Sequence, residues 1–392
     1  MRIGVDASCW GNKRGFGRFT RELMTSLLEV DQRNEYVFFI DSKTADSFPL
    51  PEGALVDVVQ TSASQVEAAS ADGRRSMSDV LAMSRKVFGH KLDLFFFPAV
   101  YSYFPIFNKT KVIVTVHDVI ADRNPQLIFP NKRSMYFWKL KQNLAIRQAD
   151  IVLTVSDYSK GRIEEYFGLS ESRMRVVNEG TREEFRVFPN NGKMGGVLSR
   201  FGLEPGSRFL LYVGGISPHK NLNSLAEAFE KISARPDCED VRLVLVGDYK
   251  DDPFFSAYPS LKKQFEEAGI DDKVIFTGFV SDEDLAMLYN AASLLVFPSL
   301  EEGFGLPAIE AMSCGTPVAA SNTGSLPEVI SGAGKFFDPR DPDDIARVAY
   351  EVLSSETLRS EMREAGLRRS RDFEWEKAAR DAAKIFEEAV YG

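Results

Sequence analysis

The chain has 392 residues, of which 44% are hydrophobic and 27% are charged, a composition typical of soluble globular proteins and a length that suits two domains. No apolar run approaches the ~20 residues that a membrane span needs, and three widely spaced cysteines exclude a disulfide framework or a cysteine-based metal site. The net charge of −9 is uneven, because residues 1–190 hold 26 Lys and Arg against 23 Asp and Glu (+3), whereas the remainder holds 22 against 34 (−12). The basic half favours an anionic partner for one domain, with chance drift between domains as the alternative.

The first half alternates apolar runs with helical patterns, which predicts a parallel sheet built from βαβ units. Because the chain opens on a strand and not on a signal peptide, we expect a cytoplasmic protein. The predicted strands are 3–6, 36–40, 55–59, 92–97, 112–116, 151–155 and 175–177, and the main helices are 18–29, 76–88, 132–147 and 158–166.

A Gly-, Pro- and Asn-rich stretch, 186–196, is the predicted linker, after which the alternation starts again. We expect domain boundaries at 1–190 and 191–372, with a last helix, 373–392, that either crosses back to the first domain or caps the second. Two doubly wound domains would face each other across a cleft at the carboxyl ends of their strands. The second set of predicted strands is 209–213, 242–246, 274–276, 294–297 and 318–319.

A glycine-rich turn between a buried strand and a helix carries two carboxylates, Glu302 and Glu310. Gly303 and Gly305 allow a ligand to approach the backbone closely, and Pro307 suits a first helical turn whose N–H groups would face an anion. A carboxylate one turn into that helix needs a different partner, such as sugar or ribose hydroxyls. The pattern therefore indicates a diphosphate flanked by hydroxyl-bearing groups, as in a nucleotide sugar.

This segment resembles the Glu-x7-Glu motif of retaining glycosyltransferases of family four, which have the GT-B fold, and the flanking Gly-Phe-Gly-Leu-Pro and Glu-Ala-Met also match. The resemblance implies that Glu310 holds the ribose and that Glu302 orients the donor sugar. It extends over nearly the whole chain and is strongest from 209 to 330. The donor contacts that it implies in this turn come from Gly303, Phe304, Gly305, Leu306 and Glu310.

The loop after strand 209–213 reads Gly214-Gly215-Ile216-Ser217-Pro218-His219-Lys220-Asn221 and resembles the family's phosphate loop. The resemblance assigns Lys220 to the donor diphosphate, with Gly215 beside it. His219 stands where the family usually has arginine, and a histidine is often neutral at pH 7, so its charge at the phosphate stays open.

In the first domain, His117 ends strand 112–116 and resembles the family's histidine near the reacting carbon. Gly15 and Gly17 precede the first helix, where the family has a loop that touches donor and acceptor. A dinucleotide fingerprint with Asp41 as ribose ligand is the alternative, but ten residues separate the strand from Gly17, and the fingerprint turn is tighter than that. Ser156 and Glu179 face the same predicted edge by position alone.

In the second domain, Gly247, Phe279 and Val280 follow strands and are expected to hold the nucleoside base, largely by backbone groups, as the family does. Asp282-Glu283-Asp284 mimics a metal motif of another glycosyltransferase architecture. Ser281 three residues before Asp284 instead predicts a helix cap, and we expect no metal site there.

Segment 129–147 mixes basic residues with aromatic ones, which is typical either of a helix on an anionic membrane surface or of an ordinary helix packed on its sheet. The membrane alternative would place the protein at the inner face of the membrane.

Taken with the resemblance, the sequence predicts a hexosyltransferase that moves glucose or mannose from a UDP or GDP sugar to a carbohydrate or lipid-linked acceptor. Such an enzyme would act in exopolysaccharide, lipopolysaccharide or other glycolipid synthesis, without a metal or other cofactor and without nucleic acid. The alternatives are an NAD-dependent oxidoreductase and a non-catalytic subunit that binds nucleotide sugars.

Overall fold

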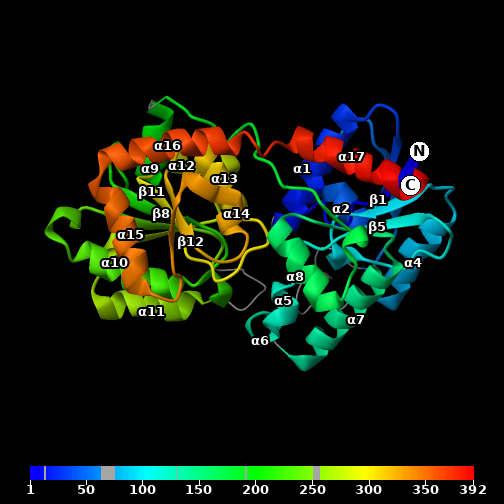
Figure 1. Cartoon of the computed structure of the whole chain (residues 1–392), viewed down its shortest axis with the longest axis horizontal. Coiled ribbons are helices and arrows are strands. Elements are labelled where there is room, and N and C mark those ends of the chain that lie inside the picture. The colour runs from blue at the N-terminus through cyan, green and yellow to red at the C-terminus, as the bar shows by residue number, and fades with distance from the viewer. Residues whose placement is uncertain (13–14, 63–75, 130, 190–191, 250–256) are drawn as a thin grey trace. The chain divides into compact units, whose positions relative to one another are not determined.

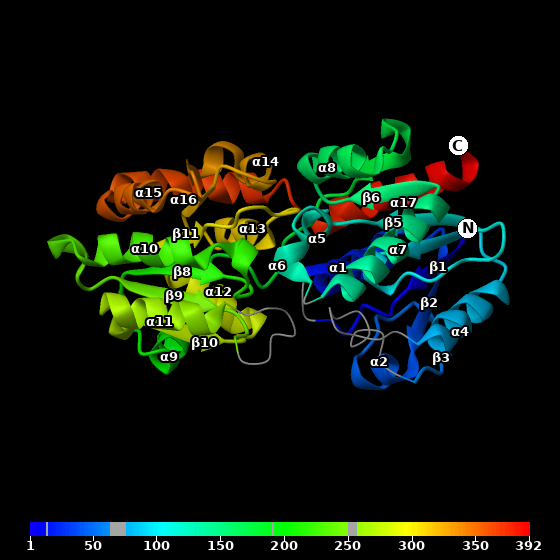
Figure 2. The same cartoon turned by 90° about the horizontal axis from the view of Figure 1, so that it is seen from below.

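The computed structural model describes residues 1–12, 15–62, 76–129, 131–189, 192–249 and 257–392. They form two compact α/β units, of which unit 1 comprises Met1–Glu179 with Glu374–Gly392 and unit 2 comprises Gly180–Phe373. Helices lie on both faces of the sheet in each unit (Figures 1 and 2).

Unit 1 is built on a seven-stranded parallel sheet in the order β3-β2-β1-β4-β5-β6-β7. Each predicted strand of the first half is present. The strands are β1 (Arg2–Asp6), β2 (Glu35–Asp41), β3 (Leu55–Val59), β4 (Leu94–Phe97), β5 (Lys111–Thr115), β6 (Ile151–Thr154) and β7 (Met174–Val176). The helices are α1 (Gly15–Val30), α2 (Ser42–Ser47), α4 (Met77–Phe88), α5 (Ile120–Arg123), α6 (Pro125–Ile128), α7 (Lys132–Gln148), α8 (Asp157–Phe167) and α17 (Trp375–Tyr391), with short 3-10 turns η1 (Val100–Ser102) and η2 (Glu171–Arg173).

Unit 2 is built on a six-stranded parallel sheet in the order β10-β9-β8-β11-β12-β13. The strands are β8 (Phe209–Val213), β9 (Arg242–Val246), β10 (Val274–Gly278), β11 (Leu294–Phe297), β12 (Val318–Ser321) and β13 (Lys335–Phe337). The helices are α9 (Gly192–Arg200), α10 (Leu222–Ser233), α11 (Tyr258–Ala268), α12 (Asp282–Ala291), α13 (Leu306–Ser313), α14 (Leu326–Ile330), α15 (Pro342–Ser354) and α16 (Glu356–Ser370). Short 3-10 turns are η3 (Pro218–Lys220), η4 (Pro236–Cys238), η5 (Asp271–Lys273) and η6 (Ser331–Ala333).

The central strands are apolar on both faces, as a parallel sheet covered by helices on both sides requires. All residues of β4, β8 and β11 are buried. In unit 1, Phe95 and Phe97 of β4 pack in the same cluster as Val114 of β5 and Phe104. Burial of these side chains is the main favourable contribution to folding.

The expected linker at 186–196 is wrong in part. The chain passes from unit 1 to unit 2 after Glu179, and residues 192–200 form helix α9, whose Met194, Val197 and Leu198 are buried. Their i, i+3, i+4 spacing gives a helical apolar face, and α9 packs on α12. Segment 180–189 is bound to α12 as well, because Asn290 accepts from the Phe188 N–H at 2.8 Å.

The chain returns to unit 1 at Glu374, and α17 lies along α1 (Figure 1). The Trp375 and Phe19 rings meet edge to face with centroids 5.9 Å apart. Near the other end of α17, Arg175 of β7 donates two hydrogen bonds to the Glu388 carboxylate, one of 3.0 Å. The last helix is therefore part of the first unit's structure.

In both sheets the strand order reverses beside the first strand, β1 in unit 1 and β8 in unit 2. The loops that leave β1 and β4, and those that leave β8 and β11, diverge there, and open α/β sheets bind ligands at such points. The candidate residues of each unit lie in these loops and in those that follow β5 and β12.

Candidate active site

In unit 2 the predicted phosphate loop is bound directly to the loop that follows β11. The Leu300 N–H donates to the His219 carbonyl at 2.9 Å. The Asn221 amide donates to the carbonyls of Pro298 at 3.1 Å and Pro339 at 2.6 Å. Asn221 is left-handed (φ 58°, ψ 37°), a conformation that asparagine tolerates better than most residues. One side chain therefore fixes the end of the phosphate loop to its neighbours.

Lys220 and Glu302, predicted separately, form an ion pair with Nζ 2.6 Å from Oε1, and both side chains are largely buried. Burial alone raises the pKa of the Glu302 carboxyl, but the Lys220 ammonium outweighs it and holds that pKa below its usual range. Beneath the pair, the buried Tyr212 hydroxyl donates to the Gly215 carbonyl at 2.8 Å. Burial, with the Glu302 charge as a second cause, raises the pKa of Tyr212, so this hydroxyl stays a donor.

The loop after β12 supports the Glu302 turn from below, and sequence reasoning did not select it. Thr323 Oγ1 donates to the Leu300 carbonyl at 2.9 Å, and Ser325 Oγ approaches the carbonyls of Glu302 and Phe304 at 3.1 and 2.7 Å. Gly324 (φ +70°) lies so close that a Cβ there would be 2.8 Å from the Glu302 nitrogen. The sequence signal that could have identified this loop is its position directly after β12, the strand that pairs with β11.

Helix α13 begins after Gly305, whose φ of 108° favours glycine. Pro307 has no N–H, and the Ala308 N–H donates to the Gly305 carbonyl at 2.9 Å. The helix start therefore has fewer amide donors for an anion than the sequence predicts. Leu306 is buried, and the buried Phe304 ring meets Phe373 edge to face, with centroids 5.5 Å apart.

Glu310 lies one turn into α13 and is only 2% exposed. The Tyr289 hydroxyl of α12 donates to Glu310 Oε2 at 3.0 Å, a contact that sequence reasoning missed. The carboxylate orientation is thus set by a neighbouring helix. Beside it, burial raises the pKa of the Cys314 thiol, with the Glu310 charge as the second cause.

The remaining predicted donor residues of unit 2 lie at the carboxyl ends of β8, β9 and β10. The loop after β9 comes so close to the loop after β8 that a Cβ on Gly247 would be 2.0 Å from the Gly214 oxygen. Position 247 therefore requires glycine. His219 Nδ1 is 3.2 Å from Ser217 Oγ. After β10, Phe279 is 67% exposed whereas Val280 is buried.

In unit 1 the His117 imidazole is fixed at the carboxyl end of β5. Nε2 is 3.1 Å from the Pro98 carbonyl, which can only accept, so Nε2 is the donor. Nδ1 is 3.7 Å from Oε1 of the buried Glu179, and the ring edge meets Phe19 with centroids 4.8 Å apart. Glu179 is thus brought to His117, as its position suggested.

Gly15 and Gly17 are not in a free loop, because α1 begins at Gly15. A Cβ on Gly17 would be 2.1 Å from the Asn12 oxygen, so this glycine is required by backbone packing, whereas the position of Gly15 is open. The dinucleotide alternative has no support here. The buried Asp41 carboxylate caps α2 by accepting from the Thr44 N–H at 3.0 Å and its hydroxyl at 2.7 Å.

The acidic triplet forms the first turn of α12, and Ser281 before it caps the helix, as predicted. Ser281 Oγ accepts from the Asp284 N–H at 3.3 Å. Asp282 pairs with Arg182, and Asp284 pairs with Arg200. Among the residues described, no group of three His, Cys, Asp or Glu side chains is arranged to hold a metal ion.

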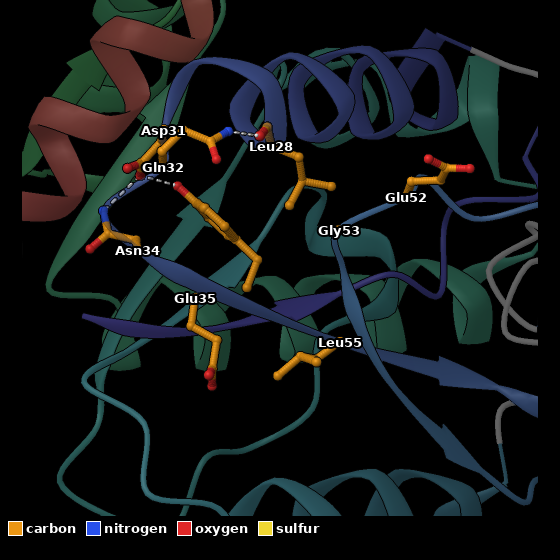
Figure 3. Close-up of a pocket in the computed structure, with 9 residues that line it drawn as sticks. Leu28, Asp31, Gln32, Asn34, Glu35, Glu52, Gly53 and Leu55 are labelled. Carbon is orange, nitrogen blue, oxygen red and sulfur yellow. Dashed lines mark hydrogen bonds between the residues drawn. The ribbon is translucent and has the colours of Figure 1, made fainter.

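A pocket of about 540 Å³ in unit 1 lies at the opposite, amino end of the sheet (Figure 3). Two of its carboxylates already have partners, because Asp31 accepts from Tyr36 and Asn34 at 2.6 Å each and Glu35 pairs with Arg2. Burial raises the pKa of Asp31, but these hydrogen bonds outweigh it and lower the pKa below the usual range. The lining residues are Leu28, Asp31, Gln32, Asn34, Glu35, Tyr36, Glu52, Gly53 and Leu55.

Comparison with known proteins decides the family. Residues 14–185 match the sequence description of Glycosyltransferase Family 4, and residues 199–369 match that of Glycosyl transferases group 1. The chain belongs to glycosyltransferase family 4. It is 32% identical over 269 residues to the O-antigen chain mannosyltransferase B of Escherichia coli, covering 68% of this chain and 67% of that protein.

The chain is also 32% identical over 280 residues to the serotype-specific mannosyltransferase WbdA of Escherichia coli, covering 70% of this chain. It spans about a third of that relative's length, since 33% of WbdA is matched. Among solved structures, sucrose-phosphate synthase from Thermosynechococcus elongatus superposes with a TM-score of 0.76 at 19% identity, over 99% of this chain and 98% of that one. The Anabaena protein Alr3699/HepE, solved with UDP and glucose, gives 0.74 at 17% identity over 99% of both chains. This family-4 glycosyltransferase therefore has the GT-B fold, as the sequence predicts.

Proposed function

We propose that this glycosyltransferase moves a hexose from a nucleoside diphosphate sugar to an acceptor hydroxyl with retention at the anomeric carbon. The observation that carries the proposal is the buried Lys220–Glu302 ion pair, which joins the loops after β8 and β11 at the reversal of strand order. A cation and a carboxylate placed together in a largely buried site can serve two parts of one ligand, the anionic leaving group and a hydroxyl-bearing sugar.

In the proposed reaction the bond between the anomeric carbon and the β-phosphate oxygen breaks. Lys220 donates to the departing diphosphate, whose charge grows in the transition state. The acceptor oxygen forms the new bond on the face that the phosphate leaves, and its proton passes to the leaving phosphate oxygen. No carboxylate nucleophile is needed. In this proposal Glu302 is assigned to the donor sugar, and His117 is assigned to the reacting carbon because it resembles the family's histidine.

Nucleotide recognition is assigned to backbone groups near Gly247, Phe279 and Val280 and to Glu310. Tyr289 orients the Glu310 carboxylate so that it accepts ribose hydroxyls. Because Glu310 is so well buried, the ribose must come close to the Gly303–Gly305 turn, which has no Cβ at either glycine.

The mannosyltransferase names of the relatives favour mannose over glucose, and the O-antigen relative favours a role in polysaccharide or glycolipid synthesis. We propose a carbohydrate or lipid-linked acceptor and a site of action at the cytoplasmic face of a membrane. In the part of the chain that the structure describes, no helix has both the length and the apolar character to cross a bilayer. Lys220 and backbone donors replace a metal in this proposal, so neither a metal nor another cofactor takes part.

The test is to incubate the protein with UDP-glucose, UDP-galactose, GDP-mannose and ADP-glucose and to measure nucleoside diphosphate release with and without a saccharide acceptor. We expect one donor to be used, an α-linked product from an α-linked donor by NMR, and full activity in EDTA. A product of inverted configuration would contradict the mechanism, and activity lost in EDTA and restored by magnesium or manganese would contradict the metal-free site. Absence of diphosphate release from each donor, together with tight donor binding, would favour a non-catalytic subunit.

A further inference from the structure

Helix α7 of unit 1 carries a stripe of large apolar side chains on its solvent face. Tyr136, Phe137, Leu140 and Leu144 are between 43% and 66% exposed. Residues 136, 140 and 144 follow one another at i, i+4 and i+8, so they lie along one side of the helix. Four such side chains in one row are not the scattered exposed residues of an ordinary protein surface.

The stripe is not needed to hold α7 on its unit, because the opposite side does this. Ala145 and Ile146 belong to the buried core of unit 1. The Trp138 indole donates to Asp122 Oδ1 at 3.1 Å, and Lys141 Nζ donates to the Tyr101 carbonyl at 2.7 Å. The helix is therefore anchored on one side and presents apolar surface to solvent on the other.

The charge of α7 has one sign. Its 17 residues include five basic ones and no acidic one. Lys141 is turned inward, and Lys139 is half-buried, with its charge acting on the buried Asp122. This leaves Lys132, Arg133 and Arg147 exposed, and none of these three forms an ion pair with another described residue. Arg133 lies over the Phe137 ring, with Cζ 5.6 Å from the centroid, so positive charge and apolar surface meet on the same face.

We infer that this face of α7, defined by the exposed stripe and its three exposed basic residues, docks unit 1 on an anionic lipid surface. Aromatic and leucine side chains enter the boundary between headgroups and acyl chains, and lysine and arginine side chains meet lipid phosphates. Nucleic acid would use the charges but not the stripe, and a second copy of the helix would bring like charges together. The role of this membrane contact rests on the proposed function, since the contact would bring the transferase to a lipid-linked acceptor.

The test is co-sedimentation of the full chain with vesicles of phosphatidylcholine alone and of phosphatidylcholine mixed with phosphatidylglycerol. We expect binding to the mixed vesicles at low salt, release at high salt because charge attraction is screened, and little binding to the neutral vesicles. Lys132→Ser with Arg133→Ser should weaken binding by roughly 30-fold, the factor that two surface charges give. The matched control, Lys262→Ser with Lys263→Ser, removes two exposed lysines of α11 and should bind like the wild type.

A second pair separates the apolar contribution from the charge. Tyr136→Ser with Leu140→Ser should also weaken sedimentation with the mixed vesicles, whereas Met77→Ser with Phe88→Ser, which alters two exposed apolar residues of α4, should not. Equal binding of all variants, equal binding to neutral vesicles, or no binding by the wild type would overturn the inference. A change of oligomeric state on gel filtration only in the α7 variants would instead assign the face to a second copy.

Diphosphate release from the donor, measured without vesicles, keeps the two proposals apart. The α7 variants should release diphosphate like the wild type. Loss of vesicle binding with intact release supports the docking face. Failure of release in the wild type would contradict the transferase proposal and leave the vesicle result unaffected.

Discussion

Each unit buries a carboxylate near the carboxyl edge of its sheet, and the pKa values of the two carboxyls, Glu302 and Asp122, are shifted in opposite directions. Glu302 of unit 2 is paired with Lys220, which outweighs burial and keeps the pKa of the carboxyl low. Asp122 of unit 1 accepts from the neutral Trp138 indole, and burial raises its pKa to about 6. The negative charge is thus stabilised at Glu302 and disfavoured at Asp122, which is the difference expected if the surroundings of Glu302, and not those of Asp122, handle the charged part of the donor.

The two units also differ in the contacts that hold their candidate residues in place. Around Glu302, hydrogen bonds from Asn221, Thr323 and Ser325 join three loops, so polar groups are held before a ligand arrives. Around His117, fixation comes from one carbonyl, the nearby Glu179 and the Phe19 ring. We therefore expect substitutions in unit 2 to change nucleotide affinity and those in unit 1 to change turnover alone.

Lys220→Met gives the largest expected effect. Its charge meets the departing diphosphate, so kcat should fall by ~10²-fold or more. It also leaves Glu302 buried without its cation, which should raise the pKa of Glu302 and lower the unfolding midpoint. Donor kinetics and thermal unfolding measure both.

The control is Lys220→Met with Glu302→Gln, which should recover stability without recovering activity. A distant control, Asp282→Asn, should keep near-normal kcat. Near-normal turnover in Lys220→Met would remove this loop from the site.

His117→Ala tests the unit 1 side of the comparison. Because His117 is proposed to lie beside the reacting carbon, kcat should fall by at least ~10-fold, in the range of a single positioned catalytic group. Nucleoside diphosphate affinity, measured by calorimetry, should stay the same, and a matching loss of affinity would contradict the division between the units.

Glu310→Gln should raise the donor KM more than it lowers kcat. Ribose does not change during the reaction, so the loss of binding energy affects the ground state and the transition state alike. The donor KM should therefore rise by roughly 10-fold. Tyr289→Phe leaves the carboxylate in place but removes its hydrogen bond, and it should show a smaller shift of the same kind. A fall in kcat with unchanged KM would assign Glu310 to the chemical step instead.

Asp122→Asn should give the smallest effect, on stability. The folded pKa of Asp122, about 6, is above its unfolded value, so the native state binds more protons between about pH 4 and pH 6 and loses stability as pH rises through that window. The neutral variant should be more stable than the wild type at pH 8, by roughly 1–3 kcal/mol, and equal to it near pH 4. Urea unfolding at both pH values measures this, with the exposed Asp46→Asn as control, and a variant less stable at pH 8 would show that the Asp122 charge is used.

Most of the fold could be predicted because buried parallel strands are continuous apolar runs, as in Leu294–Phe297. Strand β13 was missed because its two apolar residues, Phe336 and Phe337, lie between Gly-Ala-Gly and Asp-Pro, which are typical of loops. Helix α9 was mistaken for linker because glycines conceal the spacing of Met194, Val197 and Leu198.

The candidate residues were chosen from the sequence one by one and not as a set of contacts. Lys220 and Glu302 are 82 residues apart, and their pairing follows only from the adjacency of β8 and β11. Tyr289 and Ser325 were missed for the same reason, since each acts on a loop or helix that is distant in sequence. The assignment of Gly17 to the donor stays a prediction, and the structure adds that backbone packing against Asn12 also requires a glycine there.

The most direct test of the central claim is calorimetric titration of the protein with nucleoside, monophosphate and diphosphate forms of guanosine and uridine. For the nucleotide that binds, we predict that the diphosphate binds much more tightly than the monophosphate in the wild type. In Lys220→Met most of this difference should disappear, while affinity for the nucleoside stays the same. An unchanged difference between diphosphate and monophosphate in Lys220→Met would contradict the account, because Lys220 would then not meet the group that leaves.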